Sequence, residues 1–134
     1  MVRLVPFHQD HLAKIELKAC HQGEATTGTS GPAITLMDGE YPAAIIGWYQ
    51  ICPGVLQVWG IFSERIRRIP LSITKTAKKL LEFALTDHHR VQISVRCDYL
   101  EGYRWAKSIG FSCEAIMDKY GADQSDYYLF ARIR

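Results

Sequence analysis

The chain has 134 residues, 48% of them hydrophobic and 22% charged, which is the composition of an ordinary folded domain rather than of a disordered segment. Its formal net charge of +2 argues against a dedicated nucleic-acid protein, and no apolar run approaches the ~18 residues that span a bilayer. We therefore predict one domain over residues 1–134 with a single core, located in the cytoplasm.

The first predicted elements are a short strand over residues 2–7 and a helix that Asp10 caps. The apolar residues on one side of this helix are Leu12, Ile15 and Ala19. The helix is expected to end near Gly23, where the backbone can leave the helical conformation at low cost.

The histidines and cysteines of the chain leave two interpretations open. His8 and His11 stand three residues apart and His21 follows Cys20, which allows a metal site, but no carboxylate or second pair completes one. Exposed or capping histidines are the alternative that we favour. The cysteines lack C-x-x-C or zinc-type spacing, so we expect reduced, mostly structural thiols at four positions: Cys20, Cys52, Cys97 and Cys113.

A meander of strands is predicted for the next part of the chain. Residues 24–32 are rich in Gly, Thr and Ser and are typical of a loop, which is a candidate lid on the substrate side. Residues 34–37 and 41–51 form two strands joined by the hairpin turn at Asp38-Gly39, and Gly47 is a candidate bulge in the second of them.

The third strand of the meander is the most apolar stretch of this region. Pro53-Gly54 predicts a turn, and residues 55–62 predict a buried strand because they are β-branched or aromatic at most positions. Gly60 interrupts this run and indicates a bulge or the close approach of a ligand.

Positive charge is concentrated directly after that strand. Six of the 16 Lys and Arg residues fall within residues 65–79, where no acidic residue occurs. A helix begins near Pro70, with apolar positions at helical spacing: Ile73, Ala77, Leu80, Leu81 and Ala84. The positive end of a helix flanked by arginines predicts an anion site for phosphate, while the alternative is a solvated basic surface.

The remaining elements are a strand, a helix and a hairpin. Residues 91–96 alternate as a half-buried strand, and a strand-helix-strand unit implies that it runs parallel to residues 55–62. His88 and His89 are expected in the loop before it, with catalysis as the alternative. Asp98 is the expected cap of the last helix, Gly110 ends it, and residues 111–120 and 126–133 form the hairpin.

The predicted fold class is α/β (α+β), with a mixed sheet, an antiparallel meander, a parallel β-α-β crossover and a C-terminal hairpin. This order resembles the fold of the GNAT N-acetyltransferases along nearly the whole chain. The segment Arg67-Arg68-Ile69-Pro70-Leu71-Ser72 is similar to the Q/R-x-x-G-x-G/A loop that holds the diphosphate of coenzyme A in that family. The second similar segment ends in Ile109-Gly110-Phe111, which resembles the end of the family's F-Y-x-x-x-G-F helix.

The chain also departs from the family pattern at chemically important positions. Pro70 and Ser72 replace both glycines of the diphosphate loop, and Pro70 thereby removes an N–H donor. Ala106 stands at the place of the tyrosine that often protonates the leaving thiolate, and Tyr99 at that of a frequent asparagine. In length and in these departures the chain looks most like the small GNAT-like proteins that bacteriophages carry.

The resemblance implies transfer of an acetyl group from acetyl-coenzyme A to an amine, either on a small molecule or on a protein. It assigns the cofactor to a set of residues: Ile61, Arg67, Arg68, Leu71, Ser72, Ile73, Tyr99 and Trp105. Glu64 is the candidate base and Tyr103 the candidate acid, each with a surface or packing role as its alternative. A degenerate binding or structural protein is the second hypothesis; no metal is expected, and a homodimer is allowed.

Overall fold

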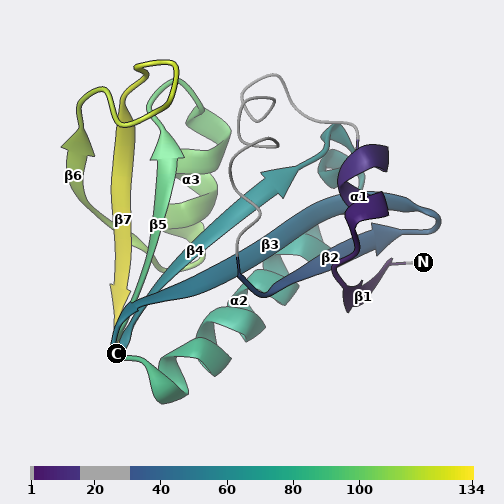
Figure 1. Cartoon of the computed structure of the whole chain (residues 1–134), viewed down its shortest axis with the longest axis horizontal. Coiled ribbons are helices and arrows are strands. Elements are labelled where there is room, and N and C mark those ends of the chain that lie inside the picture. The colour runs from purple at the N-terminus through teal and green to yellow at the C-terminus, as the bar shows by residue number, and fades with distance from the viewer. Residues whose placement is uncertain (1, 16–30) are drawn as a thin grey trace. The chain divides into compact units, whose positions relative to one another are not determined.

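The computed structural model describes residues 2–15 and 31–134 (Figure 1). Seven strands form a mixed sheet in the order β1-β2-β3-β4-β5-β7-β6, which confirms the predicted fold class. The strands are β1 (Val2–Pro6), β2 (Ala33–Asp38), β3 (Tyr41–Cys52), β4 (Val55–Phe62), β5 (Arg90–Arg96), β6 (Ser112–Met117) and β7 (Tyr127–Ile133). The helices are α1 (Gln9–Lys14), the 3₁₀ helix η3 (Glu64–Arg68), α2 (Pro70–Asp87) and α3 (Leu100–Ser108).

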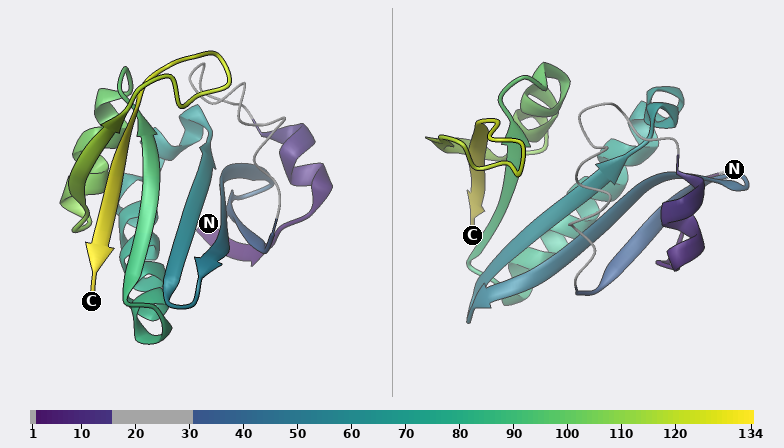
Figure 2. Two further views of the ribbon diagram at one scale, coloured as in Figure 1. Left: turned by 60° about the vertical axis from the view of Figure 1, so that its left-hand side comes forward. Right: turned by 45° about the horizontal axis from the view of Figure 1, so that its top comes forward.

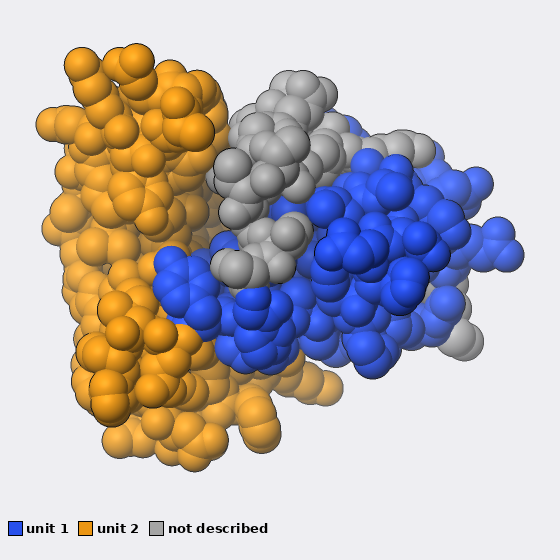
Figure 3. All heavy atoms as spheres, viewed as in Figure 1, with its two compact units in different colours: residues 1–49, 58–76 blue, residues 50–57, 77–134 orange. Residues whose placement is uncertain are grey.

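The chain divides into two compact units, which Figure 3 colours separately. Unit 1 comprises residues 1–49 and 58–76, and unit 2 comprises residues 50–57 and 77–134. Each unit is described by itself below. Among the described residues, no helix combines the length and the apolarity that a membrane span requires.

In unit 1, β1, β2 and β3 pair in antiparallel fashion. The predicted hairpin is confirmed, with Gly39 at φ +62° in the turn, a conformation that glycine adopts without steric cost. The predicted bulge at Gly47 is wrong for this ladder, because Gly47 pairs in register with Ala33 and the register shift lies between Leu36 and Met37.

The glycine at position 47 serves side-chain packing instead. A Cβ built there would lie 2.0 Å from Cζ2 of Trp59, so the indole can approach β3 this closely only because residue 47 is glycine. Trp59 belongs to the core of unit 1, which is formed around Ile15, Ile45 and Ile61. The bulge predicted at Gly60 stays a prediction.

Helix α1 is shorter than predicted and has another cap. His8, not Asp10, is the N-cap residue, because its Nδ1 accepts the N–H of Asp10 at 3.2 Å. His11 reciprocates by accepting the N–H of His8 at 3.1 Å. The capping interpretation of these two histidines is therefore confirmed. The predicted helix residues Ala19 and Gly23, residues 24–30 of the predicted lid, and Cys20 and His21 lie outside the described residues.

In unit 2, β5, β7 and β6 are antiparallel, and α3 lies along one face of them (Figure 2). The core includes Val91 of β5, Ala106 of α3 and Phe130 of β7, each at most 1% exposed. The N-cap residue of α3 is Tyr99 rather than the predicted Asp98, whose carboxylate binds Arg96. Gly110 follows the helix at φ +104°, as predicted for its end.

Helix α2 is amphipathic as predicted. Its buried residues recur at helical spacing: Ile73, Ala77, Leu81 and Leu85. At its carboxyl end Nδ1 of His88 lies 2.9 Å from the carbonyl oxygen of Ala84, and the N–H of His89 bonds to Gly54 at 3.0 Å. Both histidines therefore occupy the structural loop position predicted for them.

A pH dependence of stability follows from the bonds to His11. Its Nδ1 accepts the N–H of His8 and lies 2.8 Å from Oγ1 of Thr35, a fully buried hydroxyl. Because the His8 N–H is always a donor, Nδ1 must carry a lone pair, and the proton of the neutral ring is on Nε2. Protonation of Nδ1 would use this lone pair, so that Nδ1 could no longer accept a hydrogen bond from these donors. Burial and the neighbouring His8 lower the pKa of His11 from 6.5.

We expect the free energy of unfolding to fall as the pH drops below about 6.5, because the unfolded chain then binds the proton more strongly than the folded one. The variant His11→Asn keeps an acceptor oxygen at the place of Nδ1 but does not titrate. Its unfolding free energy, measured by urea denaturation at several pH values, should decline less than that of the wild type. Parallel curves for the two proteins would contradict this assignment.

Candidate functional site

In unit 1, the predicted basic loop is an ordered 3₁₀ helix. Ser63, which is fully buried, caps η3 by accepting the N–H of Arg65 at 3.1 Å. The N–H of Ser63 bonds to the carbonyl oxygen of Ala43 on β3 at 2.9 Å. These two bonds turn the chain from β4 into η3 and hold the turn against the sheet.

The three arginines of η3 have different surroundings. The guanidinium of Arg65 lies 3.8 Å from the ring centroid of Tyr41. Nε of Arg67 lies 3.4 Å from Oε2 of Glu64, in an exposed i, i+3 ion pair. Arg68 is exposed, ends η3, and forms no ion pair with any residue in the described part of the chain. It is thus the arginine best available to an anion.

Helix α2 begins two residues after Arg68. The N–H of Ile73 bonds to the carbonyl oxygen of Ile69 at 3.0 Å, which is the first i to i−4 hydrogen bond of the helix. The N–H groups before Ile73 belong to the first turn, where they have no partner within the helix. Leu71 is 78% exposed and Ser72 half-buried, whereas Ile73 and Ile61 are core residues. The positive end of an 18-residue helix therefore lies next to an exposed guanidinium, which is an arrangement that suits a phosphate group.

In unit 2, the predicted site residues Tyr99, Tyr103 and Trp105 lie on or next to α3. The ring of Tyr103 meets those of Tyr128 and Phe130 edge-on, with centroids 5.0 and 5.3 Å apart. The ring of Tyr99 occupies the space that a Cβ at Gly102 would need. Trp105 is half-buried. These contacts support the packing alternative for Tyr103 without deciding its chemistry.

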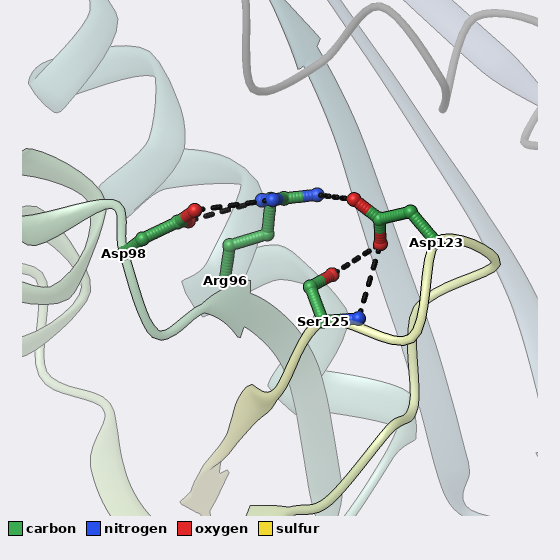
Figure 4. A network of polar contacts seen from close by, with 4 residues as sticks. All are labelled: Arg96, Asp98, Asp123 and Ser125. Carbon is green, nitrogen blue, oxygen red and sulfur yellow. Dashed lines mark hydrogen bonds and ion pairs between the residues drawn. The ribbon is translucent and has the colours of Figure 1, made fainter.

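The carboxyl end of β5 carries a network that the sequence did not predict (Figure 4). The Arg96 guanidinium donates from Nε and one terminal nitrogen to Asp98, at 3.0 and 3.1 Å, and from the other to Asp123 at 3.0 Å. Asp123 also accepts the hydroxyl and the N–H of Ser125. The network joins β5 to the β6–β7 loop. Its one local signal in the sequence was Asp123 two residues before Ser125, a spacing typical of turns in which the carboxylate bonds to the backbone.

Cysteine chemistry and metal binding receive no support in the described residues. The described cysteines, Cys52, Cys97 and Cys113, are free thiols. Burial raises the pKa of the Cys97 thiol, which disfavours the nucleophilic thiolate. No group of three or more His, Cys, Asp or Glu side chains within residues 2–15 and 31–134 is arranged to hold a metal ion.

The structure thus assigns the predicted site residues to two places. Unit 1 holds the candidate base Glu64 and the cofactor residues from the end of β4 to the first turn of α2, of which the two isoleucines are buried: Ile61, Arg67, Arg68, Leu71, Ser72 and Ile73. Unit 2 holds Tyr99, Tyr103 and Trp105 on or next to α3. Sequence reasoning missed the contacts of Tyr41 with Arg65 and of Ser63 with Ala43, because these partners are distant in the chain.

Solved structures show what this fold is similar to. Ard1 from Thermoplasma volcanium has a TM-score of 0.74 at 16% identity, with 98% of this chain and 97% of that chain covered. An acetyltransferase of the GNAT family from Bacillus anthracis gives 0.73 at 11%, covering 98% and 94%. IAA acetyltransferase from Bacillus cereus gives 0.75 at 12%, covering all of both chains. The chain therefore has the GNAT fold; identities this low establish no shared substrate.

Comparisons of sequence add nothing to this fold assignment. No protein-family model matches the chain, and no curated protein matches it.

The Arg96 network generates a prediction about acid stability. Hydrogen bonds from Ser125 and Arg96 lower the pKa of Asp123 to about 2, so its contribution to stability is present above pH 3.8 and is lost as the pH falls toward 2. We expect Arg96→Met to reduce the unfolding free energy by roughly 1 kcal/mol at pH 7. The decrease in unfolding free energy on acidification should also be smaller in this variant than in the wild type. Denaturation by guanidinium chloride at neutral and acidic pH measures both effects. An equal decrease in unfolding free energy on acidification in the variant and the wild type would contradict the prediction.

Proposed function

We propose that the chain is an N-acyltransferase that moves an acetyl group from acetyl-coenzyme A to an amine. One observation carries the proposal: η3 leads from the end of β4 to the amino end of α2 with Arg68 exposed at the junction. This segment corresponds to the diphosphate-binding loop of the family that the sequence resembles. The GNAT fold of the chain agrees with it.

The residues present suit a diphosphate in charge and in hydrogen-bond donors. Arg68 would bind it through charge-assisted hydrogen bonds, with the first-turn N–H groups of Leu71 and Ser72 as further donors. Pro70 offers no N–H, so this loop would hold the diphosphate with one backbone donor fewer than a glycine loop. The remaining proposed cofactor contacts are Ile61, Arg67, Ile73, Tyr99 and Trp105.

The bound cofactor would supply an activated thioester, and the chain would supply positioning and proton transfer. Glu64 is the proposed base that removes a proton from the attacking amine, and Tyr103 the proposed acid. The raised pKa of Cys97 favours direct attack by the amine over an acyl-enzyme on this thiol. The ion pair of Glu64 with Arg67 and the aromatic packing of Tyr103 are the observations that compete with these roles.

A second candidate function is a binding or structural protein, of bacteriophage origin, that has the fold without catalysis. Pro70 and Ala106 favour it, because the first removes a donor from the anion site and the second removes the usual acid. Turnover of acetyl-coenzyme A with any amine would exclude it. Binding without turnover would support it.

The acceptor is proposed only as an amine on a small molecule or a protein. The similar structures include a spermidine N-acetyltransferase chimera and an IAA acetyltransferase, whose names imply unrelated acceptors. A single domain in the cytoplasm, alone or as a homodimer, belongs to the same proposal.

Cofactor binding is the first test. Acetyl-coenzyme A at about 100 times its dissociation constant should stabilise the fold by roughly 2.7 kcal/mol, seen as a rise in melting temperature. Arg68→Ala should weaken binding about 10- to 100-fold, because one charged hydrogen-bonding group is lost, and Arg67→Ala should have less effect. Lys14→Ala removes an equal charge from α1 and serves as the control. No thermal shift at millimolar cofactor would reject the enzyme.

The role of Tyr103 is a separate question. Tyr103→Phe keeps the ring that packs on Tyr128 and Phe130, so the melting temperature should hold. If its hydroxyl is the acid, the rate with saturating acetyl-coenzyme A should fall ~10²–10⁴-fold and the alkaline limb of the pH–rate profile should disappear. Tyr120→Phe is the matched control. A full rate with an unchanged profile would assign Tyr103 to packing.

A further inference from the structure

The 3₁₀ helix η3 is held to β3 at two points. One is the backbone bond from the N–H of Ser63 to the carbonyl oxygen of Ala43, at 2.9 Å. The other is the contact between the Arg65 guanidinium and the ring of Tyr41, at 3.8 Å from the centroid. Tyr41 and Ala43 lie two residues apart at the start of β3, so both contacts involve one short stretch of this strand.

The contact between Arg65 and Tyr41 has the geometry of a stacked cation. A planar guanidinium within about 6 Å of an aromatic centroid is attracted by the negative face of the ring, and arginine does this better than lysine. Tyr41 is 51% exposed, so it is not a core residue whose role is explained by burial. Its ring is instead available as a platform for Arg65.

Stacking separates the roles of Arg65 and Arg68. In a 3₁₀ helix, residues three apart lie on the same face, so these two side chains start from one side of η3. The Tyr41 ring holds the guanidinium of Arg65 against β3. Arg68 stays exposed at the end of η3, next to the start of α2.

We propose that Tyr41 and Arg65 are positioning residues for the cofactor site: the stack fixes η3 so that Arg68 and the first turn of α2 face the diphosphate, and Arg65 itself does not bind phosphate. This inference rests on the proposed function. The Tyr41 ring acts only through Arg65 and touches neither the cofactor nor the reacting atoms.

The salt dependence of affinity distinguishes a positioning residue from a residue that contacts the phosphate directly. A direct ion contact with phosphate weakens as salt is added, because mobile ions screen it. Loss of a positioning stack lowers affinity by a factor that salt changes little, since the phosphate contacts that remain keep their charges. The variant Tyr41→Leu is especially informative because it alters no charge.

The experiment measures the dissociation constant of coenzyme A by calorimetry at about 50 mM and about 300 mM NaCl, where screening differs strongly. The variants are Tyr41→Leu, Tyr41→Phe, Arg65→Met and Arg68→Met. Tyr49→Leu is the matched control, since Tyr49 lies on the same strand and is 45% exposed. The melting temperature of each variant without cofactor reports whether it is folded.

We expect Tyr41→Leu and Arg65→Met to weaken binding about 3- to 10-fold at both salt concentrations, the equivalent of one cation–π contact. Tyr41→Phe should restore wild-type affinity because it keeps the ring, and Tyr49→Leu should not differ from the wild type. Arg68→Met should weaken binding most at low salt and so flatten the salt dependence.

Two results would overturn the positioning roles while leaving the enzyme intact. One is an affinity of Tyr41→Leu for coenzyme A equal to that of the wild type, when the wild type itself binds coenzyme A. The other is a flattened salt dependence of Arg65→Met equal to that of Arg68→Met, which would make Arg65 a phosphate ligand. A folded wild type that does not bind coenzyme A at either salt concentration would reject the proposed function and this inference with it.

Discussion

The arrangement of unit 1 depends on the backbone at Ser63. The chain must leave β4 there, and a buried N–H and a buried hydroxyl without partners would each cost about 1–3 kcal/mol. Both are satisfied: the N–H by Ala43 of β3 and the hydroxyl by the N–H of Arg65. The direction of η3, and hence the position of Arg68 and the start of α2, follows from these two bonds.

Three of the described arginines, Arg65, Arg90 and Arg96, have partners within the fold. Arg96 binds two carboxylates, Arg90 binds Glu114, and Arg65 lies on an aromatic ring. An arginine held in this way loses little further freedom but is also less available to a ligand. Arg68 differs because it is exposed and has no ion pair in the described residues. The number of basic residues in the segment therefore overstates the size of the candidate anion site.

The departures from the family pattern have local structural explanations that do not require the chemistry to be lost. Pro70 occupies the first residue of α2, where its fixed φ suits a helix and its missing N–H removes no ladder bond. Ala106 is fully buried between α3 and the sheet of unit 2, where a phenol would need space that the core does not offer. The same substitutions that weaken the resemblance therefore favour the helices that carry the candidate site.

The element order followed from the sequence because periodicity and turn residues act locally. Alternating apolar residues, the Asp38-Gly39 turn and the amphipathic spacing of α2 are signals over a few residues, and each was confirmed. The basic residues of the diphosphate segment were also visible in the sequence. Local signals failed where a residue had a partner that no local pattern indicated: a Cβ at Gly47 would collide with Trp59, and Asp98 binds Arg96, two residues before it, instead of capping α3.

What only the tertiary structure decided is which charges remain available. The sequence by itself determined the fold class, the amino end of α2 and the concentration of arginines before it. It could not separate Arg65 from Arg68, because that difference depends on Tyr41, which is 24 residues earlier in the chain and meets Arg65 only after β3 and η3 have packed. Contacts between distant residues form only as the whole chain folds, so a local sequence pattern does not reveal them.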